Sequence, residues 1–289
     1  LVLTLALPLG LQIQPADAQG FRFEQPRPPI EREPLPKDIE AALNMRLAYI
    51  ETGDAQTDRR TREGLNGVTL TLFRRSSVEP AEPHAVDPET DALDVYPILF
   101  LVLPDTPEPL GETAITRLNA YMRGGGTLFI DTRAGGSFGQ TDFAELTEIL
   151  PGLDTPQLMP APDDHVLSKT FYLLQDYPGR YANRPLWIEA TSGTSRDERR
   201  GDGVSRLLVT DADYVSAWAI DERGRALYSV DGGDRQREQA MRFGVNLIMY
   251  VLTGNYKEDQ VHIPALLERL GEEGGVGDFE RGSEEGVIP

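Results

Sequence analysis

The stretch from Arg123 to Gly136 reads RGGGTLFIDTRAGG, and it decides the fold class. It predicts the end of a helix, a glycine turn, a buried strand at Thr127 to Ile130, and then a polar turn, Asp131-Thr132-Arg133. In open α/β sheets, ligands and nucleophiles sit just past the carboxyl end of such a strand. The polar turn is therefore the first candidate for a functional site.

Segments with the same kinds of pattern flank this strand. The run ILFLVL at 98–103 is apolar at every position, which is typical of a strand covered on both faces. Ile115, Leu118 and Met122 share one face of a helix expected at 111–123. The same criteria predict strands at 46–50, 77–79, 186–190, 207–209, 215–220 and 226–230, an acidic loop at 80–94, and helices at 58–73, 141–150, 235–252 and 264–270, with Gly254-Asn255 between the last two as a helix end.

Alternating buried strands and helices predict an α/β fold. With right-handed crossovers, the expected architecture is flavodoxin-like: a doubly wound, mostly parallel sheet with helices on both faces. The folded domain is expected at 41–271. A proline-rich stretch at 20–40 is expected to be an extended linker, and the Gly- and Glu-rich residues 272–289 to be a disordered acidic tail.

The first 19 residues have a different character. The run LVLTLALPLGL at 1–11 is almost wholly apolar, and Ala16-Asp17-Ala18 matches the small-x-small pattern that precedes a signal-peptidase cut. Two interpretations stay open: the end of a cleaved signal peptide, or the end of a transmembrane helix. Both predict that the domain lies in the periplasm, exported or anchored to the inner membrane through this segment.

Composition excludes several classes of function. The formal net charge of -19 disfavours binding to nucleic acid. The chain has no cysteine, and its histidines at 84, 165 and 262 show no spacing typical of a metal site, so no metal is expected. Gly124-Gly125-Gly126 precedes a strand, whereas a phosphate-binding loop follows one, so no nucleotide or other cofactor is expected.

Three polar clusters each allow two interpretations. Asp131-Thr132-Arg133 either binds a small polar ligand, with Arg133 holding a carboxylate, or forms a self-satisfied polar turn. In Asp163-Asp164-His165, His165 either acts as a base or merely lies beside a helix cap. Asp231-Gly232-Gly233-Asp234 lacks the ligand spacing of a calcium loop, and a turn into the following helix is favoured.

Several longer motifs carry a family resemblance. The segments LAYIETGD at 47–54, GGTLFIDTR at 125–133, DHVL at 164–167, FYLLQD at 171–176 and RFGVNLIMYVLTGNYK at 242–257 resemble domain-of-unknown-function family 4159. The similarity covers about residues 42–271. It implies a fold similar to that of class I glutamine amidotransferases. It also implies a frequent place at the C-terminus of membrane proteins like the Bat aerotolerance proteins, and genes beside those for a MoxR-type ATPase and a von Willebrand A-type protein.

The resemblance sharpens the interpretation of the polar turn. In the amidotransferases the nucleophilic cysteine follows the strand that corresponds to 127–130, where this chain has Asp131-Thr132-Arg133. Glutamine hydrolysis by a Cys-His-Glu triad is therefore excluded. The preferred hypothesis is a non-catalytic periplasmic domain that binds envelope proteins of a MoxR/von Willebrand A-type system or a small ligand. The alternative is a non-thiol hydrolase that uses Asp131 and His165.

Overall fold

The computed structural model describes residues 36–133, 143–190 and 204–273, and for 143–145 and 254–273 it describes the backbone alone. Residues 1–19, most of the predicted linker, the expected cap Thr141 and the tail from 274 onward lie outside this part. Within it, no helix is both long enough and apolar enough to cross a bilayer.

Seven strands form a single sheet in the order β2-β1-β3-β4-β7-β6-β5. The five strands from β2 to β7 run parallel, and β6 runs antiparallel to both of its neighbours. The predicted flavodoxin-like, mostly parallel sheet is thus confirmed, with an antiparallel edge. The strands span β1 Arg46–Ile50, β2 Ala81–Val86, β3 Ile98–Val102, β4 Thr127–Asp131, β5 Leu158–Pro160, β6 Leu186–Glu189 and β7 Leu207–Thr210.

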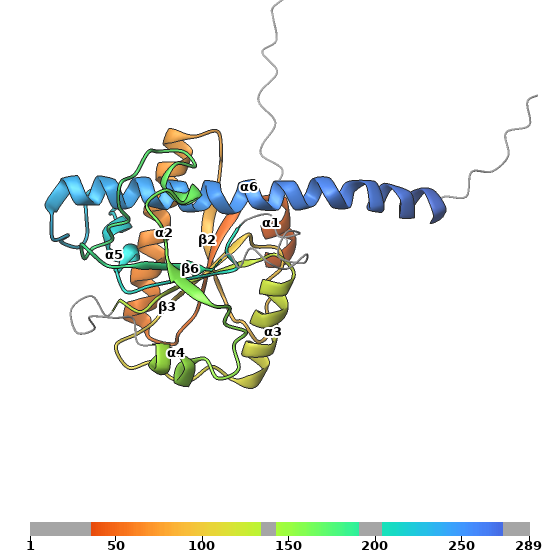
Figure 1. Cartoon of the computed structure of the whole chain (residues 1–289), viewed down its shortest axis with the longest axis horizontal. Coiled ribbons are helices and arrows are strands. Elements are labelled where there is room, and N and C mark those ends of the chain that lie inside the picture. The colour runs from red at the N-terminus through yellow and green to blue at the C-terminus, as the bar shows by residue number, and fades with distance from the viewer. Residues whose placement is uncertain (1–35, 134–142, 191–203, 274–289) are drawn as a thin grey trace, which may run out of the picture. The chain divides into compact units, whose positions relative to one another are not determined.

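Helices cover both faces of the sheet (Figure 1). In β4, Phe129 belongs to one apolar core and its neighbours Leu128 and Ile130 to the other, because successive side chains point to opposite faces. The first core includes side chains of α2 Ala55–Arg75, α5 Tyr214–Trp218, α6 Gly233–Glu273 and the short 3-10 helix η1 Val166–Ser168. The second core includes side chains of α1 Lys37–Leu43, α3 Glu112–Arg123 and α4 Phe143–Ile149.

Two glycines let α2 and α5 approach closely. A Cβ at Gly64 would lie 2.4 Å from the carbonyl oxygen of Val215, and one at Gly67 would lie 2.0 Å from that of Trp218. Trp218 is fully buried, and its indole N–H donates to the Ala240 carbonyl on α6 at 2.7 Å. These contacts join three helices on one face of the sheet.

The second strand was wrongly predicted at 77–79. It lies instead at Ala81–Val86, within the region expected to be an acidic loop. Pro83 makes this stretch look like a loop, but β2 is an edge strand that pairs only with β1. Proline is tolerated at an edge because its missing N–H leaves no bond unmade there.

Two further strand predictions were wrong. Residues 214–218 form α5, and 226–230 contribute only an isolated bridge between Ile220 and Ala226. Asp213 caps the start of this helix: its carboxylate accepts the Ser216 N–H. Because α5 is buried on every side, its sequence lacks the polar face that normally reveals a helix.

The predicted helix end at Gly254-Asn255 was also wrong. The backbone of α6 continues without interruption to Glu273, and the short helix expected at 264–270 is part of it (Figure 1). A single glycine costs a helix only about 1 kcal/mol relative to alanine, which is too little to end one by itself.

Candidate functional site

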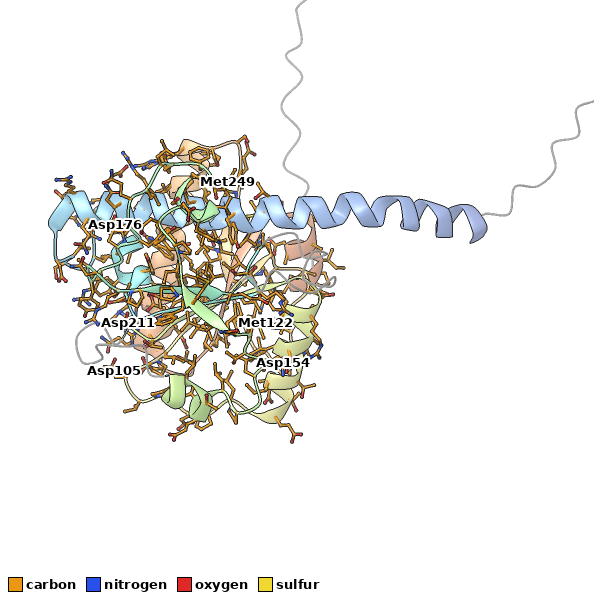
Figure 2. All side chains as sticks on the ribbon, viewed as in Figure 1. Asp105, Met122, Asp154, Asp176, Asp211 and Met249 are labelled. Carbon is orange, nitrogen blue, oxygen red and sulfur yellow. The ribbon has the colours of Figure 1, made fainter. Side chains whose placement is uncertain are left out.

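The candidate site lies at the carboxyl edge of the parallel strands. β1, β3, β4 and β7 all end at this edge, and the strand order reverses between β1 and β3. Ligands of doubly wound sheets bind in the crevice at such a switch point. Asp105, which follows β3, and Asp211, which follows β7, appear on the same side of the view in Figure 2.

Asp131 ends β4 and is completely buried. Its Oδ2 accepts the Tyr214 N–H at 2.7 Å, and its Oδ1 accepts the N–H groups of Arg133 at 2.9 Å and Asp213 at 3.2 Å. Burial, followed by the nearby Asp213 carboxylate, raises the pKa of Asp131 to about 7, against the lowering effect of these three donors. The side chain joins β4 to the N-terminus of α5, which favours the self-satisfied turn for this residue.

Asp211 and Asp213 follow β7 and are also buried. Asp213 adopts a left-handed backbone with φ 54°, and its Oδ2 accepts from Arg180 at 3.1 Å. The Oδ2 of Asp211 accepts from Arg184 at 3.3 Å, whereas its buried Oδ1 has no hydrogen-bond partner. Burial raises the pKa of Asp211. Among the described residues, no group of three potential ligands is arranged to hold a metal ion.

Thr132 and Arg133 complete the polar turn. The Thr132 N–H donates to the Thr210 carbonyl on β7 at 2.9 Å. Arg133 has φ 55°, and its side chain is buried. The guanidinium donates from Nε to the Leu103 carbonyl at 2.9 Å and from Nη2 to Asp105 at 3.2 Å. A longer contact of 3.4 Å reaches Thr57 in the first turn of α2. Arg133 therefore links the end of β3 to the start of α2 through hydrogen bonds from its guanidinium.

His165 lies elsewhere. Its Nδ1 accepts the Leu167 N–H at 3.3 Å at the start of η1, and its ring packs edge-on against Tyr250 of α6. The Tyr250 hydroxyl accepts the Ser205 N–H, two residues before β7 begins. Desolvation lowers the pKa of His165. These contacts place His165 toward the amino end of β7, whereas Asp131 lies at the carboxyl ends of the parallel strands. The structure therefore does not bring the two together as a catalytic pair.

A cavity of about 220 Å³ opens at the switch point, on the α3 side of the sheet. Its wall includes Leu103, whose carbonyl accepts from Arg133, so the cavity adjoins the polar turn. The sequence pattern alone does not identify the residues that line this cavity. Their place at the carboxyl ends of strands could have done so, since Glu51 and Asp87 each directly follow a parallel strand. The lining residues are Glu51, Thr52, Asp87, Pro88, Glu89, Leu101, Leu103, Pro104, Pro107, Glu108, Pro109, Leu110, Gly111, Ala114 and Ile149.

The Asp131 carboxylate at this edge is closed to a substrate. Both oxygens of Asp131 already accept backbone N–H groups, and none of its surface is open to a substrate. The chain has no cysteine to serve as nucleophile. The accessible feature beside the polar turn is the cavity, whose described wall combines apolar and carboxylate side chains.

Comparison with known proteins identifies a family for this chain. No curated protein gave a significant match to the chain. The sequence model of a family described as a domain of unknown function, DUF4159, matches residues 46–252, from the start of β1 to within α6. The matched residues make up well over half of the sequence, and the chain therefore belongs to the DUF4159 family.

Proposed function

We propose that this protein is a non-catalytic binding domain of a membrane-associated envelope assembly, and that it engages a partner or ligand at the switch-point cavity. The observation that carries the proposal is the burial and hydrogen bonding of the Asp131 carboxylate. The resemblance to class I glutamine amidotransferases implies a nucleophile at this position, and here the position holds a buried carboxylate bonded to three backbone N–H groups.

The proposed location is the periplasm, with export or inner-membrane anchoring through residues 1–19. The apolar run at 1–11, the proline-rich stretch at 20–40 and the absence of cysteine support it. The proposed partners are envelope proteins of a MoxR/von Willebrand A-type system, and this part rests on the family resemblance.

Site-specific crosslinking in cells tests the proposal. A photoreactive p-benzoylphenylalanine replaces the exposed Glu108 at the cavity, and in a matched control it replaces Glu79, an exposed residue before β2. We expect an envelope protein to be crosslinked from position 108 and not from 79. Equal crosslinking from both positions, or none from 108, would count against binding at this edge. A turnover activity abolished by Asp131→Asn would overturn the non-catalytic assignment.

A further inference from the structure

The floor of the switch-point cavity is apolar. Leu101 and Leu103 at the end of β3, Ala114 in α3 and Ile149 in α4 are all buried and line it. The loop between β3 and α3 adds the three prolines 104, 107 and 109 to the wall. This lining would favour the methylene groups of a ligand, since each buried CH₂ contributes about 0.8 kcal/mol.

Four carboxylates also line the cavity, and none of its described lining residues is basic. Glu51, Glu89 and Glu108 are exposed, and Asp87 is half-buried. Asp87 accepts the Glu89 N–H at 2.8 Å, which fixes the turn after β2. The charge of these side chains is not neutralised by a cation in the described wall, so the cavity attracts a positive group and repels an anion.

The N-terminus of α3 does not reverse this preference. Helix N-termini often bind anions, and the N-cap of α3, Gly111, lies at the cavity and has no capping side chain. The Glu89 carboxylate already covers this end: a Cβ at Gly111 would lie 2.5 Å from Glu89 Oε1. Arg117 donates to the Glu89 carbonyl at 2.7 Å and so holds the turn that carries this carboxylate. The negative charge of Glu89 beside this end offsets the partial positive charge of the helix N-terminus.

The size of the cavity limits the ligand. Pockets for whole drug-sized molecules span about 300–1,000 Å³, and this one holds about 220 Å³. We propose that it binds a guanidinium or ammonium group on a short aliphatic stem, as found in an arginine or lysine side chain or in a free alkylamine. The proposal rests on the function proposed above and names the class of its ligand: the stem lies on the leucine floor and the cation meets Glu51 and Glu108.

Methyl NMR titration of the full chain with Nα-acetyl-arginine amide tests this ligand class. We expect saturable shifts of the methyl signals of Leu101, Leu103, Ala114 and Ile149, with a Kd of about 1 mM or tighter. Nα-acetyl-leucine amide, which lacks the charge, should bind at least tenfold more weakly. n-Propylguanidine carries the same single cation on an aliphatic stem without peptide groups. Tighter binding of n-propylguanidine would indicate a free alkyl cation, and tighter binding of the capped arginine would indicate a protein segment.

Charge-neutral variants provide the control. Glu51→Gln combined with Glu108→Gln changes exposed side chains and should weaken binding of the arginine probe at least tenfold. Glu79→Gln removes one negative charge away from the cavity and should leave the Kd unchanged. Absence of saturable shifts, equal binding of the leucine probe, or an unchanged Kd in the double variant would overturn the proposal. Crosslinking from position 108 would still stand in that case, so failure of the ligand class and failure of the binding function are distinguishable.

Discussion

The backbone N–H of Tyr214 donates to Oδ2 of Asp131 at 2.7 Å, and this bond connects the last residue of β4 to the first residue of α5. Both residues are completely buried. In enzymes built on doubly wound α/β sheets, the side chain at this strand end commonly faces the substrate. In this chain the Asp131 side chain faces the interior and fixes α5, which packs on α2, so the strand-end position has a structural role.

The burial of Asp131 predicts a pH dependence of stability. Burial raises the pKa of Asp131 to about 7 in the folded state, from the ordinary aspartate value of 3.8. A group whose pKa is raised by folding binds its proton more tightly in the native protein. Its contribution to stability is therefore full below about pH 4 and is lost as the pH rises to about 7. Urea denaturation between pH 4 and 8 should show the free energy of unfolding falling across this window.

The variant Asp131→Asn isolates that contribution. It cannot ionise, so the fall in stability assigned to this group should disappear, while the fall due to other groups, including Asp211, remains. At pH 5 the variant should be less stable by about 1–3 kcal/mol, because an amide N–H would then face a backbone N–H. The same pH slope in the variant and the parent protein would show that Asp131 does not titrate in this range.

Arg133 should contribute to stability through its bonds to β3 and α2. Arg133→Met keeps much of the aliphatic stem but removes the donors to the Leu103 carbonyl and to Thr57. We expect a loss of about 1–3 kcal/mol in the free energy of unfolding. Asp105→Asn serves as the control and should change stability by less than about 0.5 kcal/mol, because the Asp105 side chain is 98% exposed. Equal effects in thermal denaturation would contradict the assignment to the buried contacts.

The central fold was predictable because its signals are local. The run at 98–103 is apolar at every position, the strand at 127–130 is apolar after Thr127, and both are fully buried in the middle of the sheet. The errors occur where tertiary context overrides local pattern. Pro83 is compatible with a strand only because β2 is an edge, and α5 lacks a polar face because it is enclosed by α2 and α6.

The site was only partly predictable. Position at a strand end drew attention to Asp131 and Arg133, but it could not reveal that both side chains bond to backbone partners contributed by other elements. Those partners, Leu103 and Tyr214, lie 30 and 83 residues away in sequence. The cavity carboxylates come from three separate connections, so no single stretch of sequence presents them as a cluster.

Close packing of α2 on α5 should make Gly67 intolerant of even a methyl group. On an exposed helix Gly→Ala is stabilising by about 1 kcal/mol. At Gly67 the added Cβ would lie 2.0 Å from the Trp218 carbonyl oxygen, so the helices must move apart. Gly67→Ala should therefore lower the free energy of unfolding by about 1–3 kcal/mol. Gly124→Ala is the matched control, since its Cβ would have no neighbour nearer than 3.4 Å, and this variant should be neutral or slightly stabilising.

Asn246 should hold the segment around η1 against α6. The side chain is completely buried; its Nδ2 donates to the carbonyls of Leu167 at 2.7 Å and Tyr172 at 2.9 Å, and its Oδ1 accepts the Tyr172 N–H at 2.7 Å. Asn246→Asp keeps the size but places carboxylate oxygens against two carbonyls. We expect hydrogen exchange at residues 167–174 to accelerate at least tenfold. Exchange in β3 and β4 should change less, because these strands lie in the centre of the sheet. Uniform acceleration across the domain would instead mean that Asn246 supports the whole fold.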